Sequence, residues 1–128
     1  MLKKNVDRLS HNSDNSSMDI RRRDIRIFQD RRGREPFTSW VQSLSRQYRA
    51  RVFARLDRVE TGNLGDCKSV GDGVFELRLA FGAGYRVYFG EVGSTVVLLL
   101  CGGDTSSQTK DVVKAKEYWN MYQTEYGV

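Results

Sequence analysis

The segment that most constrains the fold of this chain is residues 74–104, VFELRLAFGAGYRVYFGEVGSTVVLLLCGGD. Apolar and polar residues alternate over much of it, and glycines interrupt it twice, a pattern that predicts three short strands joined by two tight turns. The third strand, residues 95–101, is apolar on both faces, so we expect it in the centre of the sheet.

One face of the first two strands carries two arginines. Arg78 and Arg86 point away from the apolar face of the predicted hairpin, as do Glu76 and Tyr88. Two guanidinium groups on one face suggest a site for a phosphate-bearing partner, where fixed cations meet developing negative charge. The alternative interpretation is a pair of surface arginines in salt bridges with Glu76 or Glu91.

The turn at residues 82–84, Gly-Ala-Gly, predicts a register for this hairpin. Phe81 then lies opposite Tyr85. Arg78 lies opposite Tyr88, so that Arg78 and Arg86 are diagonal neighbours.

The rest of the chain supplies a tail, a first strand and helices. Residues 1–23 are polar and lack periodicity, which predicts a disordered or loosely attached tail before one domain at 24–128. Residues 24–30 predict a short strand. His11, in the tail, is the chain's one histidine, so a catalytic histidine in the folded part is excluded.

Residues 36–59 predict helical structure, starting at Pro36 and carrying apolar side chains at three- and four-residue steps. One long helix is possible, but we favour a helical hairpin that bends near residues 45–47. Gly62 or Asn63 then caps the C-terminal end. Residues 67–70 predict a further short strand before the turn at 71–73.

The C-terminal region predicts a helix that docks on the sheet. Thr105 and Gln108 match a capping box, and an apolar stripe follows them. The expected fold is therefore α+β: a small antiparallel-rich sheet, two N-terminal helices on one face, and a C-terminal helix.

Charge points toward anionic partners. The 128 residues include 21 lysines and arginines against 16 acidic residues, a net charge of +5. This balance favours nucleic acid or an acidic protein as a partner, although an arginine-rich solvated surface explains it equally well.

Two further basic groups are candidates for contact with nucleic-acid phosphates. Arg51, Arg55 and Arg58 recur at helical spacing, where a solvated helix face is the leading interpretation and a groove for phosphates or for an acidic partner helix is the alternative. Lys68, with Lys110 and Gln108 near the start of the last helix, forms the other group.

Several function classes lack their residues in this sequence. No ligand spacing for a metal occurs, no dinucleotide or phosphate-loop fingerprint is present, and we expect no cofactor. Cys101 and Cys67 match no zinc motif. No apolar run is long enough to cross a bilayer, and we expect a cytoplasmic protein without a membrane partner.

The strings EPF, FELR, GYRVYF, LLLCGGD and SSQTKDVVKAKEYW, in this order, closely resemble the addiction-module killer proteins. These are small toxins of the RelE/ParE superfamily related to the HigB group. The resemblance covers about residues 24–122 and implies a small sheet with two helices on one face and an RNA-binding concave face opposite.

This resemblance implies a type II toxin that cleaves messenger RNA on the ribosome without metal and is neutralised by a cognate, DNA-binding antitoxin. Arg86 falls where such toxins place a phosphate-binding arginine, and Arg78 and Lys68 fall where they place further basic residues. Lys110 is a looser match. Lys68 and Tyr88 are the candidates for the general base.

Position 105 departs from the family pattern, which often has lysine directly after GGD, whereas this chain has Thr105. Two alternatives therefore stay open. One is a ParE-like toxin that poisons DNA gyrase and is not a nuclease, and the other is a non-toxic regulatory binding module.

Overall fold

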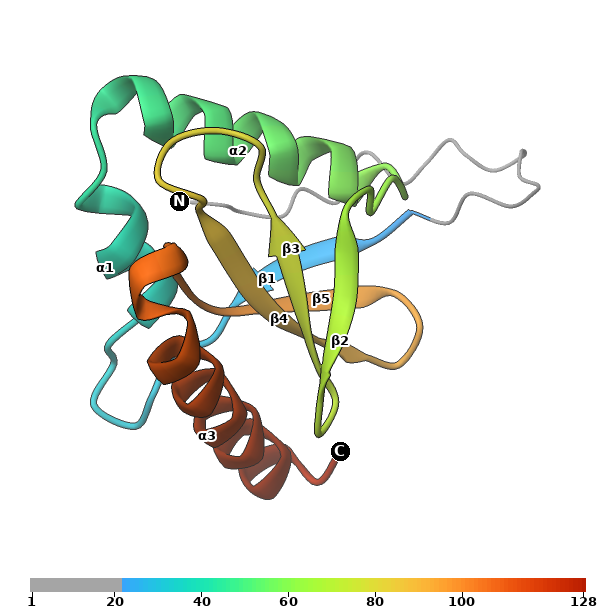
Figure 1. Ribbon diagram of the computed structural model, residues 1–128. Coiled ribbons are helices and arrows are strands. Elements are labelled where there is room, and N and C mark those ends of the chain that lie inside the picture. The colour runs from blue at the N-terminus through green and yellow to red at the C-terminus, as the bar shows by residue number, and fades with distance from the viewer. Residues whose placement is uncertain (1–21) are drawn as a thin grey trace.

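The computed structural model describes residues 22–128. Its fold class is α+β, with one five-stranded sheet and helices on both faces (Figure 1). The elements in chain order are β1 (Asp24–Ile27), α1 (Pro36–Gln42), α2 (Arg46–Glu60), β2 (Cys67–Gly71), β3 (Val74–Arg78), β4 (Arg86–Val92), β5 (Val96–Gly103), the 3-10 helix η2 (Thr105–Ser107) and α3 (Gln108–Tyr126).

The sheet is mixed and has the strand order β1-β5-β4-β3-β2. Strands β2 to β5 pair antiparallel with their sequence neighbours, and β1 pairs parallel with β5. The apolar third strand of the 74–104 segment is β5, which pairs with a strand on each side, as its two apolar faces predicted.

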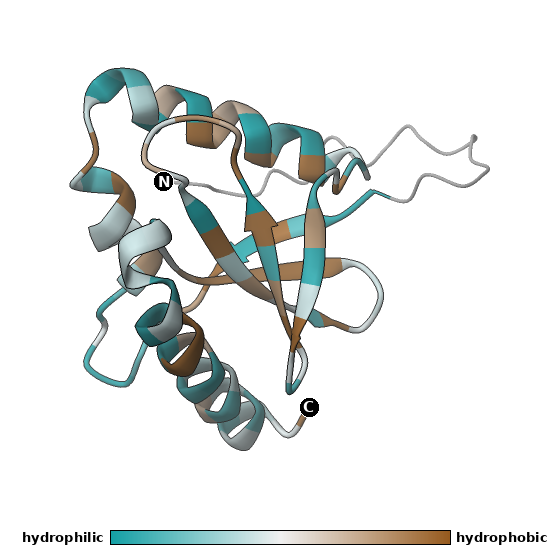
Figure 2. Ribbon diagram, viewed as in Figure 1, coloured by the Kyte–Doolittle hydropathy of each residue, from teal (hydrophilic) through white to brown (hydrophobic). Residues whose placement is uncertain are grey.

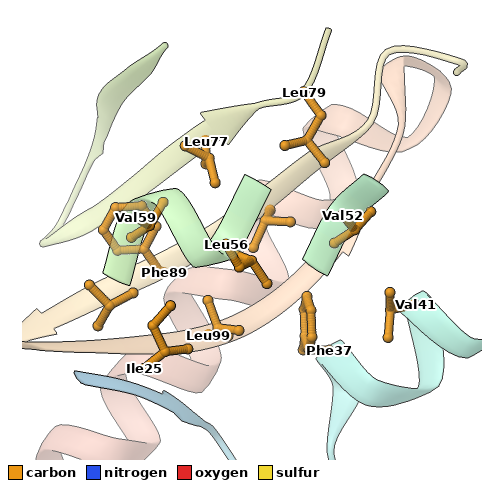
Figure 3. Packing of buried hydrophobic residues seen from close by; sticks show 12 residues of the cluster. Ile25, Phe37, Val41, Val52, Leu56, Val59, Leu77, Leu79, Phe89 and Leu99 are labelled. Carbon is orange, nitrogen blue, oxygen red and sulfur yellow. The ribbon is translucent and has the colours of Figure 1, made fainter. Parts of the chain in front are cut away.

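Two hydrophobic clusters cover the two faces of the sheet. Helices α1 and α2 pack on one face, where Phe37, Leu56 and Leu99 belong to the same buried cluster (Figure 3). Helix α3 packs on the other face, where Trp119 and Ala115 meet Leu100. Figure 2 shows apolar residues in brown along the central strands, and the helices on either side of the sheet carry many hydrophilic residues, in teal.

The predicted helical hairpin is confirmed. Helix α1 ends at Gln42, and α2 starts after Ser45, whose hydroxyl accepts a hydrogen bond from the backbone N–H of Tyr48 at 3.2 Å. Gly62, with φ of 105°, follows the end of α2 in a conformation that favours glycine.

The predicted register of the β3–β4 hairpin is wrong by two residues. Strand β3 ends at Arg78, and Arg78 lies opposite Arg86, while Glu76 lies opposite Tyr88. A longer loop accompanies the shift: the backbone N–H of Leu79 donates to the Tyr85 carbonyl at 3.0 Å, and Phe81 lies in the loop with its ring 5.9 Å from that of Tyr85. A shift of two residues keeps every side chain on its predicted face.

The loop between β3 and β4 is held against the N-terminal turn of α2. The ring of Phe81 lies 5.9 Å from that of Tyr48 and the ring of Tyr85 lies 5.4 Å from it. These aromatic contacts bury apolar surface that a tight Gly-Ala-Gly hairpin would leave exposed.

The capping box predicted from Thr105 and Gln108 is also wrong. Asp104 caps η2 by accepting from the backbone N–H of Ser106, and the Ser107 hydroxyl accepts from the Asp104 backbone N–H. The side chain of Gln108 takes no part in this cap and makes another contact, described below.

Arg23, which the prediction assigns to the tail, contacts the rest of the structure. The backbone N–H of Arg23 donates to the carbonyl of Glu60, and its side chain pairs with Glu91. Residues 1–21 of the predicted 1–23 tail, with His11, lie outside the described residues.

Candidate functional site

A buried carboxylate, Glu76, lies at the centre of the candidate site. Strand alternation places it on the α3 face of β3, between Lys68 of β2 and Tyr88 of β4 in the same cross-strand row. Its side chain is 0% exposed. The Tyr88 hydroxyl donates to Glu76 Oε2 at 3.1 Å, and Gln108 Nε2 at the start of α3 donates to the same oxygen at 2.9 Å.

Three cations surround this carboxylate. Arg78 Nε lies 3.4 Å from Glu76 Oε1, Arg86 Nε lies 3.4 Å from Oε2, and Lys68 Nζ lies 4.0 Å from Oε1. We call these four residues, with Tyr88 and Gln108, the Glu76 cluster. Three cations against one carboxylate give it a formal charge of +2.

Arg78 and Arg86 lie directly opposite each other on the antiparallel strands. Like charges in directly opposed positions destabilise a sheet unless a counter-charge offsets them. Glu76 supplies that counter-charge, because each of its oxygens is close to the Nε of one arginine. The cluster is therefore a fixed arrangement of guanidinium groups rather than two independent surface side chains.

Arg86 is the most constrained of the cations, with its side chain only 12% exposed. Its Nη1 donates to the carbonyl of Gly84 and to the hydroxyl of Thr105, both at 2.9 Å. Gly84 has φ of 75°, and a Cβ there would lie 2.2 Å from Thr105 Oγ1. Position 84 therefore requires glycine, because a Cβ has no room there. Since the Gly84 carbonyl accepts a hydrogen bond from Arg86 Nη1, the GYR sequence helps to position Arg86.

The outer edge of the arginine pair is available to an anion. Within residues 22–128, Arg78 uses its Nε for Glu76 and donates no hydrogen bond from either Nη, and its side chain is 43% exposed. Guanidinium Nη groups with fixed planes match phosphate oxygens in a bidentate manner. The chemical capacity of the site is therefore anion binding and stabilisation of negative charge on a bound phosphate.

The protonation states of the cluster follow from its contacts. Burial raises the pKa of Glu76, but hydrogen bonds from Gln108, Tyr88 and Arg78 and the charge of Arg86 outweigh it, so the pKa lies below its usual value. Burial and the neighbouring Glu76 raise the pKa of Tyr88.

These shifts bear on the predicted general base. A buried phenol that already donates to Glu76, and whose pKa is raised, is suited to holding the carboxylate rather than to accepting a proton. Tyr88 therefore fits the predicted base poorly. Lys68, with a side chain 53% exposed, is the predicted proton-transfer group that stays accessible.

The predicted RNA-binding arginines of α2 are separated by the structure. Arg51 lies over the ring of Phe81, 4.4 Å from its centroid, and thus borders the loop that leads to the cluster. Arg55 instead donates to the carbonyls of Asn63 and Leu64, in the segment that follows α2. Arg58 is exposed in the last turn of α2.

Gln108 and Lys110 also differ. Gln108 contacts Glu76 directly, although the sequence pattern gave it a capping role. Lys110 is exposed one turn into α3, beside a shallow pocket formed with Ser106, Ser107, Thr109 and Val113, and is not among the residues that contact Glu76.

Sequence reasoning missed the central role of Glu76 and the contact of Thr105 with Arg86. The salt bridges from Arg78 and Arg86 to Glu76 that the alternative interpretation predicts are confirmed, but the burial of Glu76 between the two arginines is not predicted. The signal was present, since alternation already placed an acidic residue on the same face as both arginines.

A cavity lies apart from the Glu76 cluster. It has a volume of about 680 Å³, lies between the loop after β1 and the C-terminal half of α3, and contains none of the cluster residues. No helix among residues 22–128 combines the length and apolar character that a membrane span requires.

An uncharacterized protein of Haemophilus influenzae is 49% identical to this chain over 81 residues, which cover 62% of the chain and 82% of that protein. The chain belongs to the family of this protein. No family model matches the chain. Because this relative is uncharacterized, it indicates no activity for the chain, and the proposed function rests on the contacts of the Glu76 cluster.

Proposed function

We propose that this protein is a type II toxin, an mRNA interferase of the RelE/ParE type related to the HigB group, that cleaves messenger RNA on the ribosome. The observation that carries the proposal is the opposed pair Arg78 and Arg86, held by the buried Glu76 and open on its outer edge. Such a pair suits one phosphate of an RNA chain, whose charge grows as the phosphate becomes five-coordinate.

The proposed reaction needs no nucleophile from the protein. The RNA 2′-oxygen attacks the adjacent phosphorus while the bond from phosphorus to the 5′-oxygen breaks, leaving a cyclic phosphate and a 5′-hydroxyl. The 2′-hydroxyl loses a proton and the 5′-oxygen gains one. Arg86 and Arg78 hold the phosphate in line. Lys68, on the open side of the cluster, accepts the 2′ proton after its ammonium group has lost a proton to solvent, and the ammonium group formed again gives a proton to the 5′-oxygen.

The proposal includes partners. Messenger RNA and the ribosome supply the substrate in its cleavable geometry. A cognate, DNA-binding antitoxin in the cytoplasm covers the cluster and neutralises the toxin. Because the cluster has a formal charge of +2, an antitoxin segment that covers it should bring carboxylates.

The test is cleavage by purified protein added to translating ribosomes, with new 5′ ends of the messenger RNA mapped. We expect Arg86→Ala to cleave about 10²-fold more slowly, the scale of losing one donor to a transition state. Arg32→Ala is the matched control, because Arg32 is exposed in the loop after β1 and borders the separate cavity. Naked messenger RNA tests the need for the ribosome.

Each outcome separates the alternatives. Cuts that appear only on ribosomes, persist in Arg32→Ala and fade in Arg86→Ala support the interferase. No cuts from the folded wild type overturn it. Inhibition of gyrase supercoiling would then favour the ParE-like toxin, and harmless overexpression without an antitoxin would favour the regulatory module.

A further inference from the structure

We propose that Glu76 is a positioning residue of the phosphate site, whose carboxylate fixes Arg78 and Arg86 so that their outer edges converge on one phosphate. The identity of the anion as RNA rests on the function proposed above. The role of Glu76 itself rests on the contacts of the folded chain.

Burial of the Glu76 carboxylate costs free energy. A carboxylate with 0% exposure loses its hydration, and a buried ion pair often stabilises a protein no more than apolar residues of the same volume would. An apolar residue at position 76 would continue the buried cluster that includes Val74 two residues earlier on the same face. Glu76 offsets the repulsion between the opposed Arg78 and Arg86, but apolar residues at all three positions would need no counter-charge. Stability alone therefore gives little reason for the whole arrangement of two arginines and a buried carboxylate.

The Glu76 carboxylate is itself held in place by two hydrogen-bond donors. Tyr88 from β4 and Gln108 from α3 donate to Glu76 Oε2 from two different elements. A carboxylate held in this way has one orientation. The arginines that pair with it are therefore held in a fixed orientation as well.

Glu76 contacts the Nε atoms of the two guanidinium groups and leaves other donor atoms unused. It approaches both arginines on the Nε side, at 3.4 Å in each case. The Nη2 atom of Arg86 and both Nη atoms of Arg78 donate no hydrogen bond within residues 22–128. Glu76 thus orders two long side chains before a ligand arrives and keeps their outer edges open, which reduces the entropy lost on binding.

Charge and positioning predict opposite effects when the carboxylate is removed. Glu76→Gln keeps the shape but raises the formal charge of the cluster from +2 to +3, because one negative charge is lost. Long-range attraction for RNA then stays equal or grows. Alignment of the phosphate is lost, so the rate at saturating substrate falls, roughly 10-fold or more, on the scale that a small misplacement costs.

The experiment compares wild type with Glu76→Gln in two measurements. The first is the dissociation constant for a short RNA with a 2′-deoxy substitution at the cut site. The second is the cleavage rate at saturating ribosome-bound message. Glu91→Gln is the matched control, because Glu91 lies on the same sheet and pairs with an arginine, Arg23 Nε, at 3.3 Å, outside the cluster.

We expect Glu76→Gln to bind the blocked RNA as tightly as wild type or more tightly and to cleave roughly 10-fold or more slowly at saturation. Glu91→Gln should match wild type in both measurements. Unchanged cleavage in a folded Glu76→Gln protein overturns the proposal, as does a loss of binding and cleavage by the same factor, which indicates a merely structural role.

A third measurement keeps this test separate from the proposed function. The Nε–H signals of Arg78 and Arg86 are followed by nuclear magnetic resonance while inorganic phosphate is added. Both signals should respond in the wild type, and the response should need a higher phosphate concentration or disappear in Tyr88→Phe, which keeps the charge but removes one donor to Glu76. If the wild type does not cleave RNA but shows this response, the interferase fails and the positioning role stands. If neither signal responds in the folded wild type, the positioning role fails.

Discussion

At the scale of single residues, the buried Glu76 links the candidate site to the stability of the fold. Its pKa in the folded protein lies below the ordinary 4.5, since donors from Gln108 and Tyr88 and the charge of the arginines outweigh burial. A depressed carboxylate pKa contributes stability that is present above the unfolded pKa and is lost as the pH falls through the folded pKa.

We therefore expect the free energy of unfolding of the wild type to fall more steeply below about pH 4.5 than that of Glu76→Gln, which has no carboxylate to protonate. Urea unfolding at a series of pH values between about 6 and 3 measures both slopes. Parallel curves for the two proteins would contradict the assignment of Glu76 as a carboxylate stabilised by the fold.

The residue scale also shows how far sequence reasoning reached at the site. Strand alternation correctly grouped Arg78, Arg86, Glu76 and Tyr88 on one face, because a period of two survives an error in register. It could not give the contact of Gln108 with Glu76, because that contact joins residues 32 positions apart and depends on how α3 docks.

At the scale of elements, the sequence predicted types better than boundaries and partners. The helical hairpin, the central β5 and the C-terminal helix follow from local periodicity and from the usual length of helices. The parallel pairing of β1 with β5 has no local signal, since it joins the first strand to the last one. The end of β3 at Arg78 depends on the aromatic contacts of its loop with α2.

Docking of α3 on the sheet depends on the absence of a side chain at Gly90. A Cβ at this position would lie 2.4 Å from Cε3 of Trp119, a rigid ring that is 6% exposed. We expect Gly90→Ala to lower the free energy of unfolding by about 1–3 kcal/mol, the usual cost of overpacking. Denaturant titration measures the change.

The cause is tested by combining the change with a smaller ring. If the cost arises from the Trp119 ring, Gly90→Ala in a Trp119→Phe background should lose less stability than it loses alone. Equal losses in both backgrounds would place the cost elsewhere in β4. The contact matters for the site, because α3 also brings Gln108 to Glu76.

At the scale of the whole molecule, the net charge of +5 does not say where an anionic chain binds. The sequence pattern favours the arginines of the predicted hairpin and leaves those of the helix as a less favoured alternative. The structure distinguishes them, because Arg78 and Arg86 lie side by side in the Glu76 cluster, whereas Arg55 donates to carbonyls in the segment that follows α2.

This difference predicts how binding of the blocked RNA depends on salt. Each phosphate contact with a single strand contributes about −0.7 to the slope of log K against log salt concentration. Arg78→Ala and Arg86→Ala should each make the slope shallower by about that amount. Arg55→Ala should leave the slope unchanged and lower stability instead, since it removes two hydrogen bonds to carbonyls.

Binding titrations at four or more salt concentrations measure these slopes, and thermal unfolding shows that each variant is folded. A change in slope for Arg55→Ala equal to that for Arg86→Ala would mean that RNA lies along α2 rather than across the Glu76 cluster. Counterions are released only where a cation replaces them at a phosphate, so the slopes distinguish the two paths even where the affinities are similar.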